Sequence, residues 1–281
     1  MKTLAYLSLF FALAGHASPP VPNPISRYFS RVPIERAHVV YGSAVEESLS
    51  GEDIKVLVWN VKKGARKVFH SEFMKFGEGK DIFLIQEAFT AEFFKESLAF
   101  FSNYQWDLGI SFLYKRYNND GTGNMIGSFV KPTWVKVEHT LDYEPLTETP
   151  KTTAYAKFRV NNREEEILVI SMHGINFANL GAFGRHLSQV KGHIQKHQGP
   201  VILAGDFNTR TKERYSELTT MTRALGLKEV VWLNGEVRMR AVGTSNILDH
   251  AFVKGFEVKH AEVYDSKGSD HKPMTLELHL L

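Results

Sequence analysis

Short apolar runs alternate with amphipathic stretches along most of the chain, and their spacing predicts strands and helices in turn. Continuous or alternating runs of aliphatic and aromatic residues predict strands at 54–61, 81–89, 153–160, 166–174, 200–208, 248–253 and 274–280. Apolar residues three and four positions apart predict helices at about 68–78, 90–101, 179–198 and 211–225. The glycines of the stretch 121–124 favour a hairpin turn. This order of elements indicates one α/β domain over residues 53–281, without an internal repeat.

The first seventeen residues, MKTLAYLSLFFALAGHA, have the pattern of a secretory signal peptide. Lys2 precedes an apolar run over residues 4–14, and the small residues Gly15 and Ala17 follow at cleavage positions. A membrane anchor is the alternative, but the run is shorter than the roughly 20 apolar residues that a spanning helix needs. We therefore expect cleavage after Ala17 and an exported protein, periplasmic or secreted, with no stable membrane insertion after removal of the signal.

Residues 18–52 differ in composition from the rest of the chain. Five of the ten prolines fall between Ser18 and Pro33, which predicts an extended, poorly packed lead-in to the domain that begins near Asp53. The chain has no cysteine, so disulfides and thiolate metal sites are excluded, and an exported chain of this size depends on its core for stability.

The charge balance gives little support for a broad electrostatic footprint on nucleic acid. The formal net charge is +3, and removal of the signal peptide takes away one charged residue, Lys2. Local basic pairs are the candidates for a substrate groove; they are Lys62-Lys63, Arg66-Lys67, Lys115-Arg116 and Arg238 with Arg240. Lysines are common on protein surfaces, so these pairs are modest support.

Four of the predicted strands end in hydrogen-bonding or ionisable side chains. The polar residues at these ends are Asn60, Glu87, His173, Asn176, Asp206 and Asn208. Sites in α/β folds form where strands end, so these side chains are expected to meet at one sheet edge. Strand alternation places Asp206 and Asn208 on the same face. Taken singly, each residue has an alternative role as a turn-former bonded to local backbone.

The end of the chain adds a carboxylate and a histidine. Gly268-Ser269-Asp270-His271 leads into the last predicted strand, and Asp249 opens the strand before it. Asp249 could orient and charge-stabilise His271 and leave the other ring nitrogen free to take a proton from water, as a general base does. The alternative is a His–Asp turn at the surface.

In their order, these motifs resemble those of the endonuclease/exonuclease/phosphatase superfamily. The motifs are Asn60, Gln86-Glu87, His173 with Asn176, the run Gly205-Asp206-Phe207-Asn208, Asp249 and Ser269-Asp270-His271. The superfamily includes deoxyribonuclease I, abasic-site endonucleases, neutral sphingomyelinases and inositol polyphosphate 5-phosphatases. The resemblance covers residues 54–274. It implies a four-layer αββα sandwich of two mixed β-sheets flanked by helices, and hydrolysis of phosphate esters with a divalent metal.

The resemblance also implies roles for individual residues. Glu87 would hold the metal with Asn60 and Asp270, while His173 and Asn208 would contact the phosphate. Asp206 would position or deprotonate the attacking water, or assist the leaving group, and His271, oriented by Asp249, would be the general base. Asn176 and Lys151 would bind substrate. Hard oxygen ligands suit Mg²⁺, with Mn²⁺ or Ca²⁺ as alternatives.

We therefore expect a magnesium-dependent phosphodiesterase, a secreted or periplasmic nuclease acting on DNA or RNA. A lipid-directed enzyme, either a sphingomyelinase or a phosphoinositide phosphatase, is the alternative, because it would use the same catalytic set. A non-catalytic binding module is a third class, and the competent residue type at every catalytic position argues against it. No protein partner is indicated.

Overall fold

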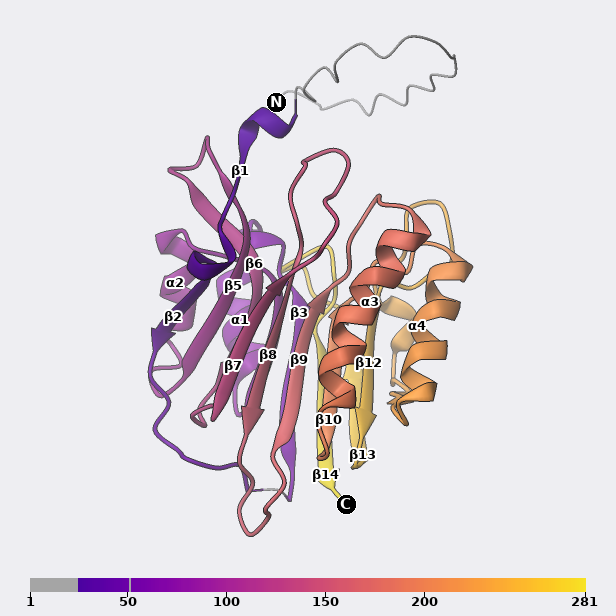
Figure 1. Ribbon diagram of the computed structural model, residues 1–281. Helices are drawn as coiled ribbons and strands as arrows, with labels where there is room; N and C mark the ends of the chain where they lie inside the picture. The colour runs from indigo at the N-terminus through magenta and orange to yellow at the C-terminus, as the bar shows by residue number, and fades with distance from the viewer. Residues whose placement is uncertain (1–24, 51) are drawn as a thin grey trace.

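The computed structural model describes residues 25–50 and 52–281, so the expected signal peptide and the start of the lead-in lie outside the described residues. The chain forms two β-sheets packed face to face (Figure 1). The first sheet contains, in spatial order, β1 (Phe29–Arg31), β5 (Gln105–Tyr114), β6 (Asp120–Ser128), β4 (Ile82–Phe89), β3 (Ile54–Asn60), β14 (Met274–Leu280) and β13 (Phe256–Val263), and β2 (His38–Gly42) also pairs with β5.

The second sheet contains β11 (Lys228–Glu229), β12 (Asp249–Lys254), β10 (Val201–Asp206), β9 (Ile167–His173), β8 (Thr152–Phe158) and β7 (Trp134–His139). Both sheets are mixed: β3 pairs with β4, and β9 with β10, in parallel, whereas the other strand pairs are antiparallel. Each parallel pair is joined through a helix, α1 (Phe69–Gly77) or α3 (Leu180–Gln195), as parallel strands require.

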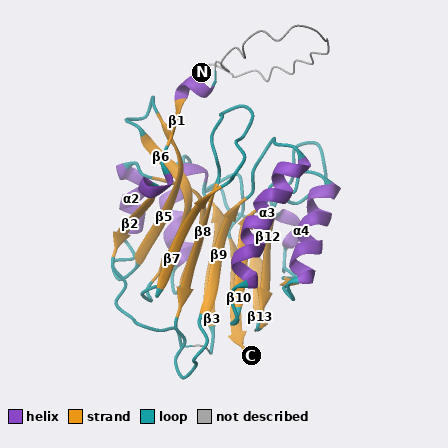
Figure 2. Cartoon of the chain, in the orientation of Figure 1, coloured by secondary structure: helices purple, strands orange, loops and turns teal. Residues whose placement is uncertain are grey.

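Side-chain alternation along the strands builds the layers. In β3, Ile54, Val56 and Val58 pack into the core between the two sheets, whereas Leu57 and Trp59 pack against α1 and α2 (Glu92–Leu98) on the outside. The outer face of the second sheet is covered by α3 and α4 (Lys212–Ala224) (Figure 2). The predicted four-layer αββα sandwich is therefore confirmed. Within the described residues, no helix is long and apolar enough to cross a bilayer.

The lead-in contributes more structure than its prolines suggest. Two short strands, β1 and β2, add to the edge of the first sheet through β5, and Ala37 and Leu49 are buried. The alternating pattern of β2, in which every second residue is partly buried, suits an edge strand. Over residues 25–50 the lead-in is therefore ordered by pairing with β5, and most of its side chains are exposed or partly buried.

The predicted hairpin turn at 121–124 is also wrong. These residues lie inside β6, and the turn between β5 and β6 falls at residues 115–119, where Asn118 and Asn119 adopt left-handed backbone. The glycines of β6 instead allow close packing, because a Cβ at Gly123 would lie 1.7 Å from the carbonyl oxygen of Gly109 on β5.

Candidate active site

Strand alternation carries the polar strand ends into the gap between the two sheets. Ile202 and Ala204 of β10 pack in this gap, so Asp206, two residues further on, faces the same way. The same alternation directs three further side chains into it: Asn60 at the end of β3, His173 at the end of β9 and Asp249 at the start of β12. The site therefore lies where the facing surfaces of the two sheets end.

Asp206 lies at the centre of this group. In the strand register its Cα pairs with that of His173 on one side and that of Asp249 on the other. Its Oδ2 accepts a hydrogen bond from Asn60 Nδ2 at 3.1 Å, across the gap between the sheets. The same oxygen lies 3.5 Å from His173 Nε2 and 3.7 Å from His271 Nε2. Asp206 is only 2% exposed, so its carboxylate faces these groups rather than bulk water.

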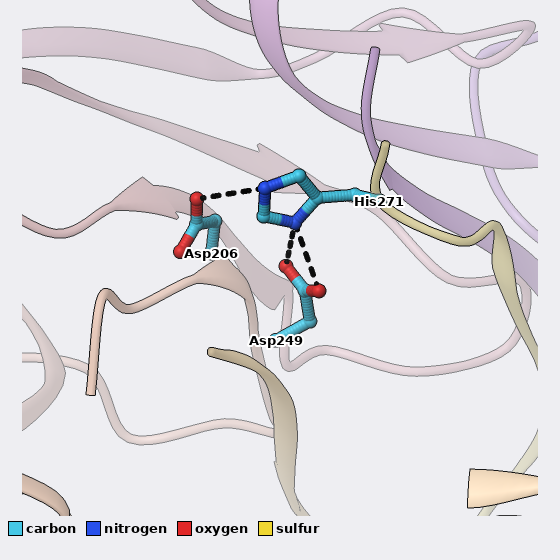
Figure 3. Close-up of side chains that lie close together, drawn as sticks. All are labelled: Asp206, Asp249 and His271. Atoms are coloured by element: carbon cyan, nitrogen blue, oxygen red, sulfur yellow. Dashed lines mark hydrogen bonds and ion pairs between the residues drawn. The ribbon is translucent and has the colours of Figure 1, made fainter. Parts of the chain in front are cut away.

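His271 is held between two carboxylates (Figure 3). Its Nδ1 donates to both carboxylate oxygens of Asp249, at 2.8 and 2.9 Å. The backbone of His271 is fixed by Trp59, whose indole N–H donates to the His271 carbonyl at 3.0 Å. Burial alone would lower the pKa of His271, but Asp249 and then Asp206 outweigh it and raise the pKa to about 10. At neutral pH the ring therefore carries a proton on each nitrogen.

His173 has the opposite character. Burial, followed by the positive charge of Lys151, lowers the pKa of His173 to about 3, so the ring is neutral at physiological pH. The neighbouring Asn208 donates its side-chain amide to the carbonyl of Gly174 at 3.0 Å and its backbone N–H to Asp206 Oδ1 at 2.9 Å. The first bond joins the loop after β9 to the loop after β10, and the second fixes the turn that follows Asp206.

Glu87 reaches the site through a break in its strand. Strict alternation would place it on the helix-covered face with Ile85. The register shift between Ile85 and Ala88, together with a left-handed φ of 55° at Glu87, brings its carboxylate to Asn60, whose Nδ2 donates to Oε1 at 3.3 Å. The other oxygen forms an ion pair with Lys63. Burial would raise the pKa of Glu87, but Lys63 and the neighbouring His173 hold it well below its usual range.

Lys62 and Lys63 follow Asn60 in a turn in which both residues have left-handed backbone, with φ of 47° and 63°. Lys62 forms an ion pair with Asp270. Burial would raise the pKa of Asp270, but Lys62 and His271 together lower it. Burial would lower the pKa of Lys63, but its pairing with Glu87 raises it to about 12. The sequence predicts both lysines as groove cations, whereas here they neutralise the carboxylates of the site.

The donor set around Glu87 fits a hard divalent cation. Glu87 and Asp270 offer carboxylate oxygens, which are among the ligands that Mg²⁺ prefers. Asn60 faces Glu87 with its Nδ2, and its side-chain oxygen accepts from the backbone N–H of Lys62 at 3.1 Å. A second group, Asp206, Asp249 and His271, has ligand atoms within 4.8 Å of one another. The Glu87 set offers oxygen ligands alone, which suits a hard cation better than a group that includes an imidazole.

Lys151 and Asn176 lie at the rim, joined through Glu144. Lys151 Nζ lies 3.4 Å from Glu144 Oε1, and the same oxygen accepts from the backbone N–H of Asn176 at 2.8 Å. The side-chain oxygen of Asn176 is occupied by Arg210 Nε and by the backbone N–H of Phe177. Asn176 therefore orders its own loop. Glu144 was not predicted, because it lies in an irregular segment without a motif.

Comparison with known proteins agrees with this arrangement. The sequence profile of the Endonuclease/Exonuclease/phosphatase family matches residues 57–271, and the chain belongs to this family. Members of the superfamily are phosphoester hydrolases, and they generally use divalent metals.

Three relatives illustrate the similarity. UPF0294 protein VP2298 of Vibrio parahaemolyticus is 28% identical over 275 residues, covering 98% of this chain and 92% of that protein. An endonuclease/exonuclease/phosphatase family protein from Leptotrichia buccalis has a TM-score of 0.59 at 17% identity, covering 80% of this chain and 99% of its own. The endonuclease domain of TRAS1, a telomere-specific non-LTR retrotransposon, has a TM-score of 0.52 at 19% identity, covering 81% and 99%. The structural matches establish the fold alone.

Proposed function

We propose that this protein is a magnesium-dependent phosphodiesterase, exported to the periplasm or secreted, that acts as a nuclease on DNA or RNA. The observation that carries the proposal is the position of Asp206: a buried carboxylate with Asn60, His173 and His271 aimed at one of its oxygens. The family supports phosphoester hydrolysis in general, and the predicted signal peptide supports export.

In the proposed reaction, Asp206, His173 and His271 have separate roles in accepting and donating protons. Asp206 positions the attacking water and accepts its proton, because His271 already carries one at neutral pH. The neutral His173 donates its Nε2–H to a phosphoryl oxygen. His271, oriented by Asp249, donates its Nε2–H to the oxygen of the phosphate or of the leaving group on which negative charge develops. This division differs from the sequence-based expectation, in which His271 is the base.

Glu87, Asn60 and Asp270 are the proposed holders of the metal. When bound there, a divalent cation would supply positive charge that offsets the negative charge of the phosphoryl oxygens in the transition state. Lys151 adds a further positive charge at the rim, close enough to lower the pKa of His173, and this supports its predicted role in substrate binding.

The rim favours nucleic acid over lipid as the substrate. Arg210 is a fixed cation next to the exposed ring of Phe177, a combination typical of sites that bind single-stranded nucleic acid.

The test is to incubate the mature protein with plasmid DNA, RNA, sphingomyelin vesicles and inositol phosphates, first with Mg²⁺ and then with a chelator. We expect cleavage of nucleic acid that requires the metal. Turnover of sphingomyelin or inositol phosphates alone would support the lipid-directed alternative. Turnover of none of the four, or turnover indifferent to the chelator, would refute the proposal.

A further inference from the structure

Phe177 is an exposed aromatic residue in an unfavourable backbone conformation at the rim of the site. It is 60% exposed, although phenylalanine is usually buried. Its φ is 54°, in the left-handed region that bulky residues rarely occupy. The exposure of the ring and the left-handed φ together indicate a function for this side chain, because residues with strained backbone conformations are concentrated at functional sites.

Hydrogen bonds from two loops hold this conformation. The side-chain oxygen of Asn176 accepts the backbone N–H of Phe177 at 2.9 Å and also accepts Nε of Arg210. The guanidinium carbon of Arg210 lies 4.8 Å from the centre of the Phe177 ring, within the range of a cation–π contact. The backbone of Arg210 is fixed in turn, because Asn246 Nδ2 donates to its carbonyl at 2.7 Å.

The pair lies on the two loops that leave the proposed reaction centre. Phe177 follows His173 by four residues, and Arg210 follows Asp206 by four. The two loops touch at their base, where Asn208 donates to Gly174 and where a Cβ at Gly174 would lie 2.2 Å from the carbonyl oxygen of Phe207. The loops that carry Phe177 and Arg210 therefore leave the site together, from the strand ends that bear His173 and Asp206.

We propose that Phe177 and Arg210 form a stacking subsite for an unpaired nucleobase next to the cleaved phosphodiester, so that the substrate is a single-stranded nucleic acid. This inference rests on the proposed nuclease function and narrows its substrate. An aromatic face stacks on any base, and arginine adds cation–π attraction. Bases inside a duplex already stack on their neighbours and do not present a free face to the ring. A bilayer would have to bury the Arg210 charge along with the ring, which is costly.

The test measures binding of a 5′-fluorescein-labelled single-stranded oligonucleotide to the mature protein by fluorescence anisotropy, with a chelator present to prevent turnover. We expect Phe177→Ala to weaken binding about tenfold, as for the loss of one base–aromatic stack. Phe177→Gly, which removes the ring but suits the left-handed φ, should weaken it equally, and Phe177→Tyr should retain binding. Phe93→Ala is the matched control, because Phe93 is a 49% exposed phenylalanine in α2, which packs on the other sheet.

Equal binding of the oligonucleotide by wild type and Phe177→Ala would overturn the proposal. So would tighter binding of the wild type to a fully paired duplex than to the single strand, or binding to phosphatidylcholine–sphingomyelin vesicles without binding to the oligonucleotide. Hydrolysis of methyl p-nitrophenyl phosphate, which has no nucleobase, separates the two claims. If the wild type hydrolyses it while Phe177 has no effect on oligonucleotide binding, the subsite is wrong and the phosphodiesterase stands. If the wild type does not hydrolyse methyl p-nitrophenyl phosphate, and oligonucleotide binding still depends on Phe177, the subsite stands and the proposed catalysis is wrong.

Discussion

Nδ1 of His271 donates to both carboxylate oxygens of Asp249, at 2.8 and 2.9 Å, and this contact joins the two sheets at the site. Asp249 begins β12 of the second sheet, and His271 precedes β14 of the first. The contact fixes both the orientation of the ring and the nitrogen that faces Asp206.

Asp249→Asn should reduce kcat by on the order of 10²- to 10⁴-fold, because His271 loses the anion that orients the ring and stabilises its protonated form. KM should change little, since Asp249 does not contact substrate. By NMR titration, the pKa of His271 should fall from about 10 towards its ordinary value. Asp265→Asn is the control, since Asp265 is an exposed carboxylate paired with Lys272. A kcat within twofold of the wild type would contradict the role of Asp249.

Lys63→Gln should strengthen Mg²⁺ binding by about tenfold, because the ammonium group of Lys63 occupies and neutralises Glu87. Removing a like charge next to a cation site favours the cation. Isothermal titration calorimetry measures the affinity without turnover. Lys136→Gln, which removes the lysine paired with Glu138 on β7, should leave it unchanged. Weaker Mg²⁺ binding by Lys63→Gln would mean that Glu87 is not the metal ligand.

The parts of the site that follow strand periodicity could be predicted from the sequence. Asp206 and Asn60 continue the inward-facing positions of buried strands, so their motifs were enough to bring them together. The strands β5, β6, β7 and β13 were missed: β5 and β6 interrupt their apolar residues with glycines and polar residues, and β7 and β13 are charged strands at the ends of the two sheets. Tertiary pairing to neighbouring strands determines their structure.

The parts of the site that could not be predicted depend on backbone conformations that no sequence pattern indicates. Lys63, Glu87 and Phe177 all have left-handed φ without being glycine. Such positions are held by tertiary contacts, such as the ion pair of Glu87 with Lys63. Glu87 could therefore be predicted from its motif, whereas its neutralisation by a lysine could not.

Gly205→Ala should destabilise the protein by about 2 to 3 kcal/mol. Gly205 has a φ of 144°, and a Cβ there would lie 2.0 Å from the carbonyl oxygen of Met172 on the neighbouring strand β9. Gly192→Ala is the opposite control, because this position in α3 has no atom within 4 Å of the added Cβ; it should stabilise the helix by up to about 1 kcal/mol. Urea denaturation measures both. A Gly205→Ala variant as stable as the wild type would show that the two strands can separate at low cost.

His186 should make the fold less stable in acid. Its Nδ1 accepts from the backbone N–H of Ile175 at 3.3 Å and its Nε2 contacts Thr153 Oγ1 at 2.9 Å. Burial lowers its pKa to about 3. Between the ordinary pKa of about 6.5 and this value, the unfolded chain binds a proton that the folded chain does not. Stability is therefore complete above pH 6.5 and falls as the pH drops towards 3.

The measurement is the free energy of unfolding in urea at pH 7 and pH 5 for the wild type and His186→Gln. His173 titrates in the same range, so the difference between the two proteins isolates His186. The wild type should lose up to about 1.4 kcal/mol more per pH unit than the variant. An identical pH slope in the two proteins would show that His186 is not buried as a neutral ring.

The central claim is that Asp206 is the proton acceptor of a metal-dependent phosphodiesterase. The most direct measurement is kcat for hydrolysis of a single-stranded oligonucleotide in Mg²⁺ by the wild type and by Asp206→Asn, which is nearly isosteric, with thermal denaturation to verify that the variant folds. We expect metal-dependent turnover by the wild type and a loss of at least about 100-fold in the variant. A folded Asp206→Asn protein that retains kcat within tenfold of the wild type would contradict it.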